Sequence, residues 1–279
     1  MKNNINVENY PIIKNGLKPG KTSVIIACTH GNETCGVSAF DFLIPNLSID
    51  SGTVIFCIGN PRALRENKRF VEMNLNRAFK NKKLLTPDEI QTYEYKRSEE
   101  IKLLLDKADA LLDIHSSTNI PAEQFIICEP NSYFISDQLP FDKQISGFDE
   151  YEPGGTESYM NEKTKIGIGI ECGQHNDPLS IDKAKESILI FLIAMGHIKG
   201  VNKIQNQERL KINFLYKNIN KDFTLSRDFF DFEEIEKDTL IGYDGETPVF
   251  SPFKSKILFA HNYKNQTGQE CFLLAELLN

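Results

Sequence analysis

Short apolar runs alternate with longer segments of helical periodicity up to about residue 200. Five runs have the length and β-branched composition of buried strands, at residues 22–27, 53–58, 110–114, 125–128 and 165–170. Apolar residues recur at helical spacing in residues 34–44, 86–107 and 180–197. The sequence Thr86-Pro-Asp-Glu89 is typical of a helix start, with a Thr cap and Pro in the first turn. We therefore expect an α/β domain over residues 1–200, doubly wound around a mixed, mostly parallel sheet.

The pattern changes after residue 200. Short alternating runs at residues 211–216, 247–250 and 256–259 are separated by turn signals such as Tyr243-Asp-Gly245. This texture predicts a small β-rich domain over residues 201–279.

Charge and composition exclude several classes of protein. The 39 acidic and 32 basic residues give a net charge of −7, which argues against a surface for nucleic acid. The longest apolar run, residues 188–195, is too short to span a bilayer, so we expect no membrane partner. The start, residues 1–8, lacks the apolar segment of a secretory signal, and the six cysteines form no CxxC pair. These features favour a cytoplasmic protein with reduced thiols.

Polar residues directly follow four of the predicted strands. His30 and Glu33 follow the first strand, Asn60 the second, His115 the third and Glu171 the last. Because ligands bind outside the carboxyl ends of the strands in an open parallel sheet, we expect these side chains to converge on one edge.

His30 and Glu33 lie three residues apart, so that both can face one centre, and a distant histidine completes a His-Glu-His set. That set is a common donor set of catalytic zinc. Each signal alone is ambiguous. A histidine at a strand end is more often structural, and a glutamate in a first helical turn also satisfies the helix dipole.

Five motifs together are more specific. They occur in the order His30-Gly-Asn-Glu33, Asn60-Pro-Arg62, Asn74-Leu-Asn76-Arg77, Asp113-Ile-His115 and Glu171-Cys-Gly173. In these motifs the chain resembles the succinylglutamate desuccinylase/aspartoacylase family, a branch of the zinc carboxypeptidase-like fold. The resemblance implies that fold for the sheet, with the C-terminal domain covering the active site.

The resemblance also implies the chemistry, which is hydrolysis of the amide bond of a small N-acyl amino acid. One Zn2+ ion per chain would be held by His30, Glu33 and His115. Zinc-bound water would be the nucleophile. Glu171 would be the general base that later protonates the leaving amine, and Arg69 would stabilise the oxyanion.

The same resemblance assigns the substrate contacts. Asn76 and Arg77 would bind the substrate carboxylate, and Tyr263 would lie at the pocket mouth. Taken from the sequence alone, Arg69 and Arg77 also fit a solvated basic face. Asp113, two residues from His115, is either a partner that fixes the imidazole or a capping or solvated residue. The remaining histidines, His175, His197 and His261, match no ligand of the family and are interpreted as surface or structural residues.

Two positions depart from the family pattern. Asn161 stands where aspartoacylases carry the arginine that reads a side-chain carboxylate, so either Lys163 or Lys165 substitutes or the substrate lacks a second carboxylate. Asn74 stands where aspartoacylases carry an aspartate.

Two other functions are compatible with the sequence. One is a zinc carboxypeptidase-type activity on a short peptide, with the same residues. The other is a non-catalytic member that binds metal or a carboxylate, although simple binding requires neither Glu171 nor Arg69. A homo-oligomer is also compatible with the sequence.

Overall fold

The computed structural model describes residues 10–278, so the predicted absence of a signal at residues 1–8 lies outside the described residues. The chain forms two compact units: one contains the chain up to Gln144 together with Phe148–Gln207, and the other contains Ile145–Gly147 and the chain from Glu208 onward. Within residues 10–278, no helix combines the length and apolar character that a membrane span requires.

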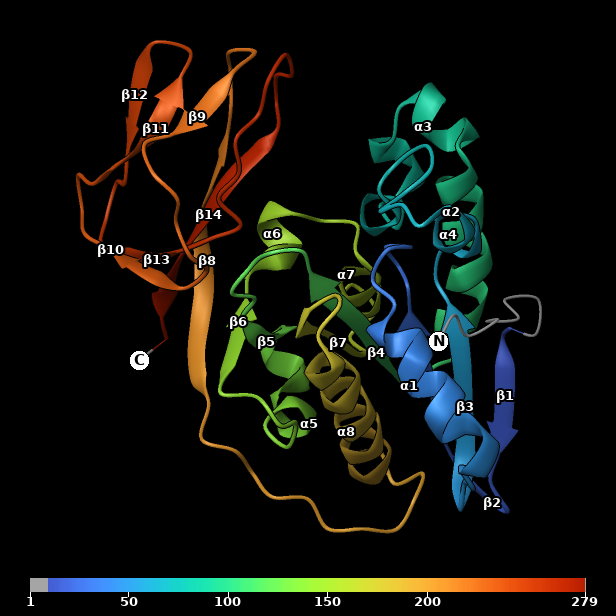
Figure 1. The fold of residues 1–279 in the computed structure, drawn as a ribbon. Helices are drawn as coiled ribbons and strands as arrows, with labels where there is room; N and C mark the ends of the chain where they lie inside the picture. The colour runs from blue at the N-terminus through green and yellow to red at the C-terminus, as the bar shows by residue number, and fades with distance from the viewer. Residues whose placement is uncertain (1–9, 279) are drawn as a thin grey trace. The chain divides into compact units, whose positions relative to one another are not determined.

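The first unit is built around a large mixed sheet (Figure 1). Its strand order is β1-β3-β2-β4-β7-β5-β6, and β3, β2, β4 and β7 run parallel while β1 and β5 are antiparallel to their neighbours. The strands are β1 (Ile12–Asn15), β2 (Lys18–Ala27), β3 (Ser51–Ile58), β4 (Ala110–Ser117), β5 (Gln124–Cys128), β6 (Lys143–Ser146) and β7 (Ile166–Gln174). The expected mixed α/β fold with a large, mostly parallel sheet is confirmed.

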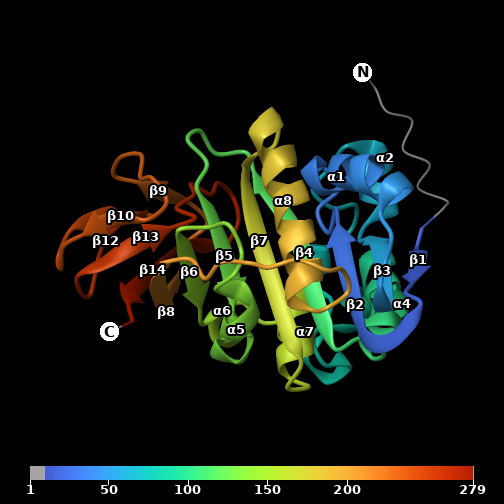
Figure 2. The same cartoon turned by 90° about the horizontal axis from the view of Figure 1, so that it is seen from below.

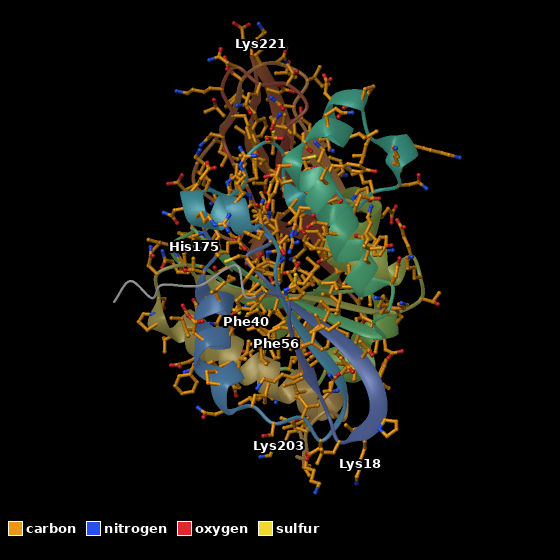
Figure 3. The ribbon with its side chains drawn as sticks, turned by 90° about the vertical axis from the view of Figure 1, so that its right-hand side faces the viewer. Lys18, Phe40, Phe56, His175, Lys203 and Lys221 are labelled. Atoms are coloured by element: carbon orange, nitrogen blue, oxygen red, sulfur yellow. The ribbon has the colours of Figure 1, made fainter. Side chains whose placement is uncertain are left out.

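Helices cover both faces of this sheet. They are α1 (Cys35–Leu43), α2 (Pro61–Glu66), α3 (Pro87–Gln91), α4 (Tyr93–Leu105), α5 (Tyr133–Ser136), α6 (Phe148–Tyr151), α7 (Thr156–Asn161) and α8 (Pro178–Ala194). On one face α1 and α8 pack on the sheet, where the rings of Phe40 and Phe56 lie 5.1 Å apart (Figures 2 and 3). On the other face Leu105 of α4 and Met160 of α7 join the apolar cluster that includes Leu111.

Strand alternation decides which side chains of β4 face which layer. Successive side chains of a strand point to opposite faces, so Leu111, Asp113 and His115 share the face covered by α4 and α7. Leu112 and Ile114 point to the opposite face and join the core beneath α1 and α8. A strand that is buried from Ala110 to Ser116 therefore presents Asp113 and His115 on one side near its carboxyl end.

The single helix predicted over residues 86–107 is wrong in one respect. The capping box of Thr86 and Glu89 is present, but the helix that it starts ends at Gln91 and a second one begins at Tyr93. Thr92 between them is extended, and its hydroxyl donates to the Glu89 carbonyl and accepts from the Tyr95 amide. Thr92 therefore caps a new helix, which turns the chain where periodicity alone predicts a continuous helix.

The second unit is rich in β structure. One antiparallel group has the order β8-β14-β13-β10, and a three-stranded sheet has the order β12-β11-β9. Its strands are β8 (Glu208–Lys217), β9 (Phe223–Leu225), β10 (Glu233–Ile235), β11 (Leu240–Asp244), β12 (Thr247–Phe250), β13 (Ser255–Leu258) and β14 (Glu270–Leu277). Aromatic side chains fill its core, where the rings of Tyr216 and Phe272 stack 5.3 Å apart.

Candidate metal centre and active site

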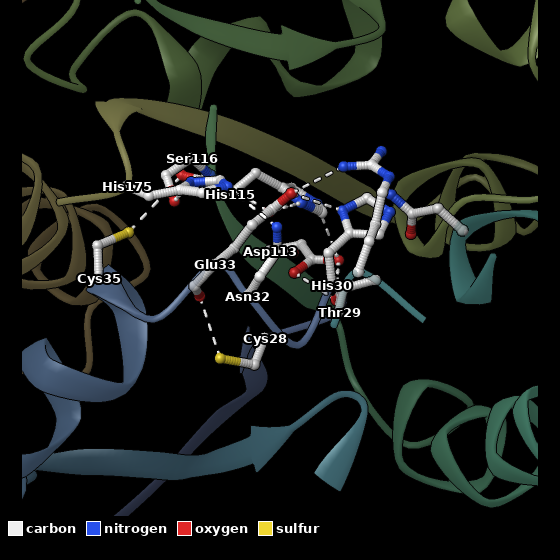
Figure 4. A network of polar contacts seen from close by, with 12 residues as sticks. Cys28, Thr29, His30, Asn32, Glu33, Cys35, Asp113, His115, Ser116 and His175 are labelled. Atoms are coloured by element: carbon white, nitrogen blue, oxygen red, sulfur yellow. Dashed lines mark hydrogen bonds and ion pairs between the residues drawn. The ribbon is translucent and has the colours of Figure 1, made fainter. Parts of the chain in front are cut away.

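Three buried side chains from two distant segments of the chain meet at the carboxyl ends of β2 and β4. One ligand atom from each of His30, Glu33 and His115 lies within 4.8 Å of the others. Glu33 bridges the two rings, because its Oε1 is 2.9 Å from His30 Nδ1 and its Oε2 is 2.9 Å from His115 Nδ1 (Figure 4). The structure thus brings together the predicted His-Glu-His set.

The loop after β2 has its shape for local reasons. Cys28 adopts a left-handed conformation (φ 54°), which ends the strand, and its thiol donates to the Glu33 carbonyl at 3.0 Å. Gly31 passes so close to α2 that a Cβ atom there would lie 2.2 Å from the carbonyl carbon of Ala63. The close packing against α2 therefore leaves room only for glycine at position 31, between the histidine and the glutamate of the cluster.

Each histidine of the cluster has a second partner on its other nitrogen. His30 Nε2 donates to Asn74 Oδ1 at 3.0 Å, and the same oxygen accepts from the Asn76 amide at 2.9 Å. His115 Nε2 lies 3.4 Å from Asp113 Oδ2. These partners direct both Nδ1 atoms toward Glu33 and the centre of the cluster.

Asp113 is itself held by hydroxyl groups. Thr29 Oγ1 donates to the carboxylate at 2.8 Å, and Thr156 Oγ1 of α7 donates at 2.6 Å. The structure therefore favours a role as the partner that fixes the imidazole of His115 over the solvated alternative, since Asp113 is fully buried.

The electrostatics of the cluster keep negative charge on Glu33. Burial alone would raise the pKa of this carboxyl, but its contacts with His30 and His115 hold the pKa well below the ordinary range. Burial lowers the pKa of His30. Burial also works against charge on His115, yet the carboxylates of Asp113 and Glu33 raise its pKa well above the ordinary value. The site as a whole suits a cation.

Two further predicted residues lie beside the cluster. Glu171 on β7 pairs in register with His115 on β4, so in this parallel pair both side chains leave the same face of the sheet. Arg69 places Nη1 3.1 Å from Glu33 Oε1, and its side chain is 52% exposed.

The segment that carries Asn76 and Arg77 also reaches this edge, through the contact between Asn74 and His30. Asn76 is nearly buried in the 3₁₀ turn Leu75–Arg77. Arg77 donates through Nη2 to Glu152 Oε2 at 2.7 Å, so the guanidinium assigned to the substrate carboxylate contacts an internal carboxylate.

The two lysines considered as substitutes at the Asn161 position are directed elsewhere. Lys163 Nζ is 2.7 Å from Asp106 Oδ1, and Lys165 Nζ donates to the carbonyls of Leu105 and Asp106. These groups lie just before β4, at the amino-terminal end of the strands, whereas the cluster lies at the carboxyl end. Neither lysine replaces the missing arginine.

One histidine outside the predicted site residues lies at the edge of the site. His175, taken as a surface or structural histidine, places Nδ1 2.9 Å from Ser116 Oγ, and its Nε2 accepts from the Asn32 amide at 3.3 Å. Its signal was its position just after Gln174, where β7 ends, four residues beyond Glu171. His197, by contrast, is buried and structural, between Ser51 and Ser23.

Tyr263 belongs to the second unit. There its backbone N–H and carbonyl exchange hydrogen bonds of 2.9 Å with Phe223. Its place at the pocket mouth stays a prediction.

Comparisons with known proteins bear on the family and the fold of this chain. The sequence model for the succinylglutamate desuccinylase/aspartoacylase catalytic domain matches residues 19–198. The N-acyl-aromatic-L-amino acid amidohydrolase (carboxylate-forming) of Rattus norvegicus is 30% identical over 183 residues, which are 56% of this chain and 54% of that protein. The chain thus spans about half the length of this relative.

Two desuccinylases match over more of the chain. Succinylglutamate desuccinylase of Shewanella pealeana is 24% identical over 298 residues, covering 92% of this chain and 83% of that protein. The crystal structure of the desuccinylase from Vibrio cholerae superposes with a TM-score of 0.77 at 19% identity, over 93% of this chain and 82% of that one. The latter likeness shows that the fold is shared.

Proposed function

The chain belongs to the succinylglutamate desuccinylase/aspartoacylase family, and we propose that it is a zinc-dependent deacylase that hydrolyses the amide bond of an N-acyl amino acid. One observation carries the proposal: the buried cluster of His30, Glu33 and His115 has Glu171 in register beside it and Arg69 on its carboxylate. This arrangement combines a cation site, a base and a fixed positive charge at one edge of the sheet.

The residues present fit a zinc ion. Two imidazole nitrogens and one carboxylate are the donors that zinc prefers in catalytic sites, and here they are buried and aimed at one centre. Asn74 and Asp113 contact the outer nitrogens of the two rings, as ligand histidines require. When bound, zinc would supply a Lewis acid that activates water and polarises the acyl carbonyl.

The chain's own residues perform the remaining steps. Glu171 takes a proton from the attacking water and delivers it to the leaving nitrogen, which a carboxylate within hydrogen-bond reach of both can do. Arg69 carries a permanent charge and stabilises the negative charge that develops on the acyl oxygen. Asn76 and Arg77 bind the carboxylate of the substrate, with Arg77 exchanging its contact with Glu152 for one with the ligand.

The side chain of the substrate amino acid lacks a cationic partner at the Asn161 position. Asn161 donates to Asp149 Oδ2 at 3.0 Å, and neither Lys163 nor Lys165 reaches the site, so this position supplies no cation for a second carboxylate. We therefore propose an amino acid with a neutral side chain. The name of the rat relative, which specifies aromatic amino acids, supports this choice.

The test is amine release from a panel that combines acetyl, succinyl and longer acyl groups with acidic and neutral amino acids and that also includes short peptides. We expect turnover of derivatives of neutral amino acids and little turnover of N-acyl aspartate or glutamate. Turnover of short peptides alone would instead indicate a carboxypeptidase-type activity. Zinc binding without turnover of any member would indicate a non-catalytic protein.

A further inference from the structure

A loop with little regular structure carries several of the proposed site residues. This arginine loop (residues 69–77) contains Arg69, Asn74, Asn76 and Arg77, and within it only the 3₁₀ turn Leu75–Arg77 is regular. Arg69 contacts Glu33, and Asn74 contacts His30, so the conformation of the loop sets the geometry around the cluster. Something outside the loop has to hold it.

Glu94 meets this need from the first turn of α4. Its carboxylate is fully buried and accepts hydrogen bonds from three consecutive loop amides: Val71 at 2.7 Å to Oε1, and Glu72 and Met73 at 3.2 Å each to Oε2. Asn60 Nδ2 adds a fourth hydrogen bond to Oε1, at 3.1 Å. A buried carboxylate is costly unless N–H groups surround it, so these donors and Glu94 determine each other's positions.

A side chain of the loop also contacts helix α4. Glu72 Oε2 accepts from the Tyr93 amide at 2.7 Å, at the first residue of α4, and Glu72 Oε1 accepts from Arg62 at 3.2 Å. Asn60, the other partner of Glu94, caps α2 through the Ala63 amide at 3.0 Å. The arginine loop is thus fastened to two helices by side chains that do not themselves reach the metal cluster.

We propose that Glu94 is a positioning residue that fixes the arginine loop so that Arg69, Asn76 and Arg77 are set for the substrate. The link to substrate rests on the proposed function. Glu94 acts through the backbone amides of residues 71–73, because its carboxylate is used entirely by the loop and Asn60.

The first test needs no variant. Hydrogen exchange of the full-length protein should show strong protection of the amides of Val71, Glu72 and Met73, although they lie outside every helix and strand. Rapid exchange of all three would overturn the proposal, whether or not any variant of Glu94 folds.

The second test removes one acceptor. In Glu94→Gln an amide NH₂ group replaces one carboxylate oxygen. Two of the N–H groups that donate to Glu94 then face another donor, and their hydrogen bonds are lost. The sequence contains no tryptophan, and Phe70 on the loop is 41% exposed, so Phe70→Trp gives a single fluorescent reporter. In this background we expect Glu94→Gln to raise acrylamide quenching of the tryptophan at least twofold. The matched control is Glu99→Gln, on the same helix, whose half-exposed carboxylate pairs with Lys102, and it should leave quenching unchanged.

Kinetics separate this proposal from the proposed function. With an active protein, Glu94→Gln should lower kcat/KM at least tenfold, and a large part of this loss should be a rise in KM. The zinc stoichiometry of this variant should stay unchanged. Glu99→Gln should match the wild type in both measurements. Unchanged quenching and kinetics in Glu94→Gln would overturn the positioning role and leave the deacylase proposal standing. Increased quenching in a protein that hydrolyses no acyl amino acid would support the fastening of the loop and contradict the proposed function alone.

Discussion

Four groups converge on the carboxylate of Glu33. They are the Nδ1 atoms of His30 and His115, the guanidinium of Arg69 and the backbone amide of Ser116 at 3.3 Å. A carboxylate so supplied with partners stays ionised, and this charge suits a bound cation. A single side chain thus connects the predicted metal site with the predicted oxyanion residue.

The three residues of the metal cluster could be predicted from the sequence, because each follows a strand and lies in an ordered motif, whereas Arg69 lies outside these motifs and is assigned through the family resemblance. The side chains that these and the neighbouring site residues contact could not be predicted. Glu152, which contacts Arg77, and His175, which contacts Ser116, are brought in by loop conformations that leave no periodic signal. Asn74 was identified as a departure from the family, and only the structure shows that its oxygen orients His30 while it caps the 3₁₀ turn.

Glu171→Gln tests the assignment of the base. The amide keeps the shape of the side chain but cannot accept the proton, so we expect kcat to fall by about 100-fold or more. Zinc stoichiometry should stay at the wild-type value, because Glu171 is not among the three clustered residues. Near-normal kcat in this variant, measured by amine release, would show that another group is the base.

Glu152→Gln tests whether Arg77 binds the substrate. The Arg77–Glu152 pair is mostly shielded from solvent, so loss of the negative charge leaves the guanidinium available to an anionic ligand. We expect KM for carboxylate-bearing substrates to fall about fivefold, equivalent to ~1 kcal/mol. Glu150→Gln, an exposed neighbour on α6, is the control. A KM that rises or stays constant in Glu152→Gln would contradict the role of Arg77.

At the scale of elements, the strands were easier to predict than the segments between them. A strand buried on both faces is a continuous apolar run, and the runs at β2, β3, β4, β5 and β7 were recognised for that reason. The break at Thr92 was missed because a cap depends on the conformation of one residue. Similarly, Gly167 and Gly169 look alike in sequence, yet only Gly167 abuts a backbone, since a Cβ there would lie 2.6 Å from the Glu157 carbonyl oxygen.

The close packing of the loop after β2 on α2 predicts that a larger residue at Gly31 lowers stability. Gly31→Ala places a Cβ atom against the α2 backbone, so we expect a loss of about 1–3 kcal/mol in the free energy of unfolding and weaker zinc binding. Gly169→Ala is the matched control, because the nearest atom to its Cβ is Ile127 Cβ at an ordinary 3.5 Å. Urea unfolding and zinc titration of both variants decide the matter. Equal stability of the two would mean that the loop is not constrained by α2.

At the scale of the molecule, the two compact units are not continuous in the chain. Residues Ile145–Gly147 belong to the second unit, where Ser146 Oγ donates to the Leu210 carbonyl at 3.3 Å. Gly147 has a positive φ of 94°, and its backbone packs closely against Ile212. Neither composition nor periodicity changes at these three residues, so a sequence pattern gives no sign of such an excursion. The change in sequence pattern near residue 200, in contrast, reflects the shift to antiparallel strands.

His197 links the chain after α8 to the sheet, and we expect it to make the stability of the first unit depend on pH. Its Nδ1 donates to the Ser51 carbonyl at 2.9 Å, its Nε2 is 2.8 Å from Ser23 Oγ, and burial lowers its pKa. A lowered pKa means that the folded state favours the neutral ring. This stabilisation is therefore present above the unfolded-state pKa of about 6.5 and is lost as the pH falls through the lower folded-state pKa.

Urea unfolding at pH 8 and pH 5.5 measures this contribution. The wild type should lose more unfolding free energy on acidification than His197→Gln, which has no titrating ring, while all other groups titrate in both proteins. The same loss in both proteins would show that His197 does not contribute to the acid sensitivity.

We predict that turnover requires one metal ion at His30, Glu33 and His115. The most direct measurement removes bound metal with a chelator, returns zinc stepwise, and follows both bound zinc and amine release from the best N-acyl amino acid. We predict no turnover in the metal-free protein, and a rise in proportion to bound zinc that ends at one ion per chain. Full turnover after removal of the metal, or saturation of the site with zinc without turnover, would contradict this requirement.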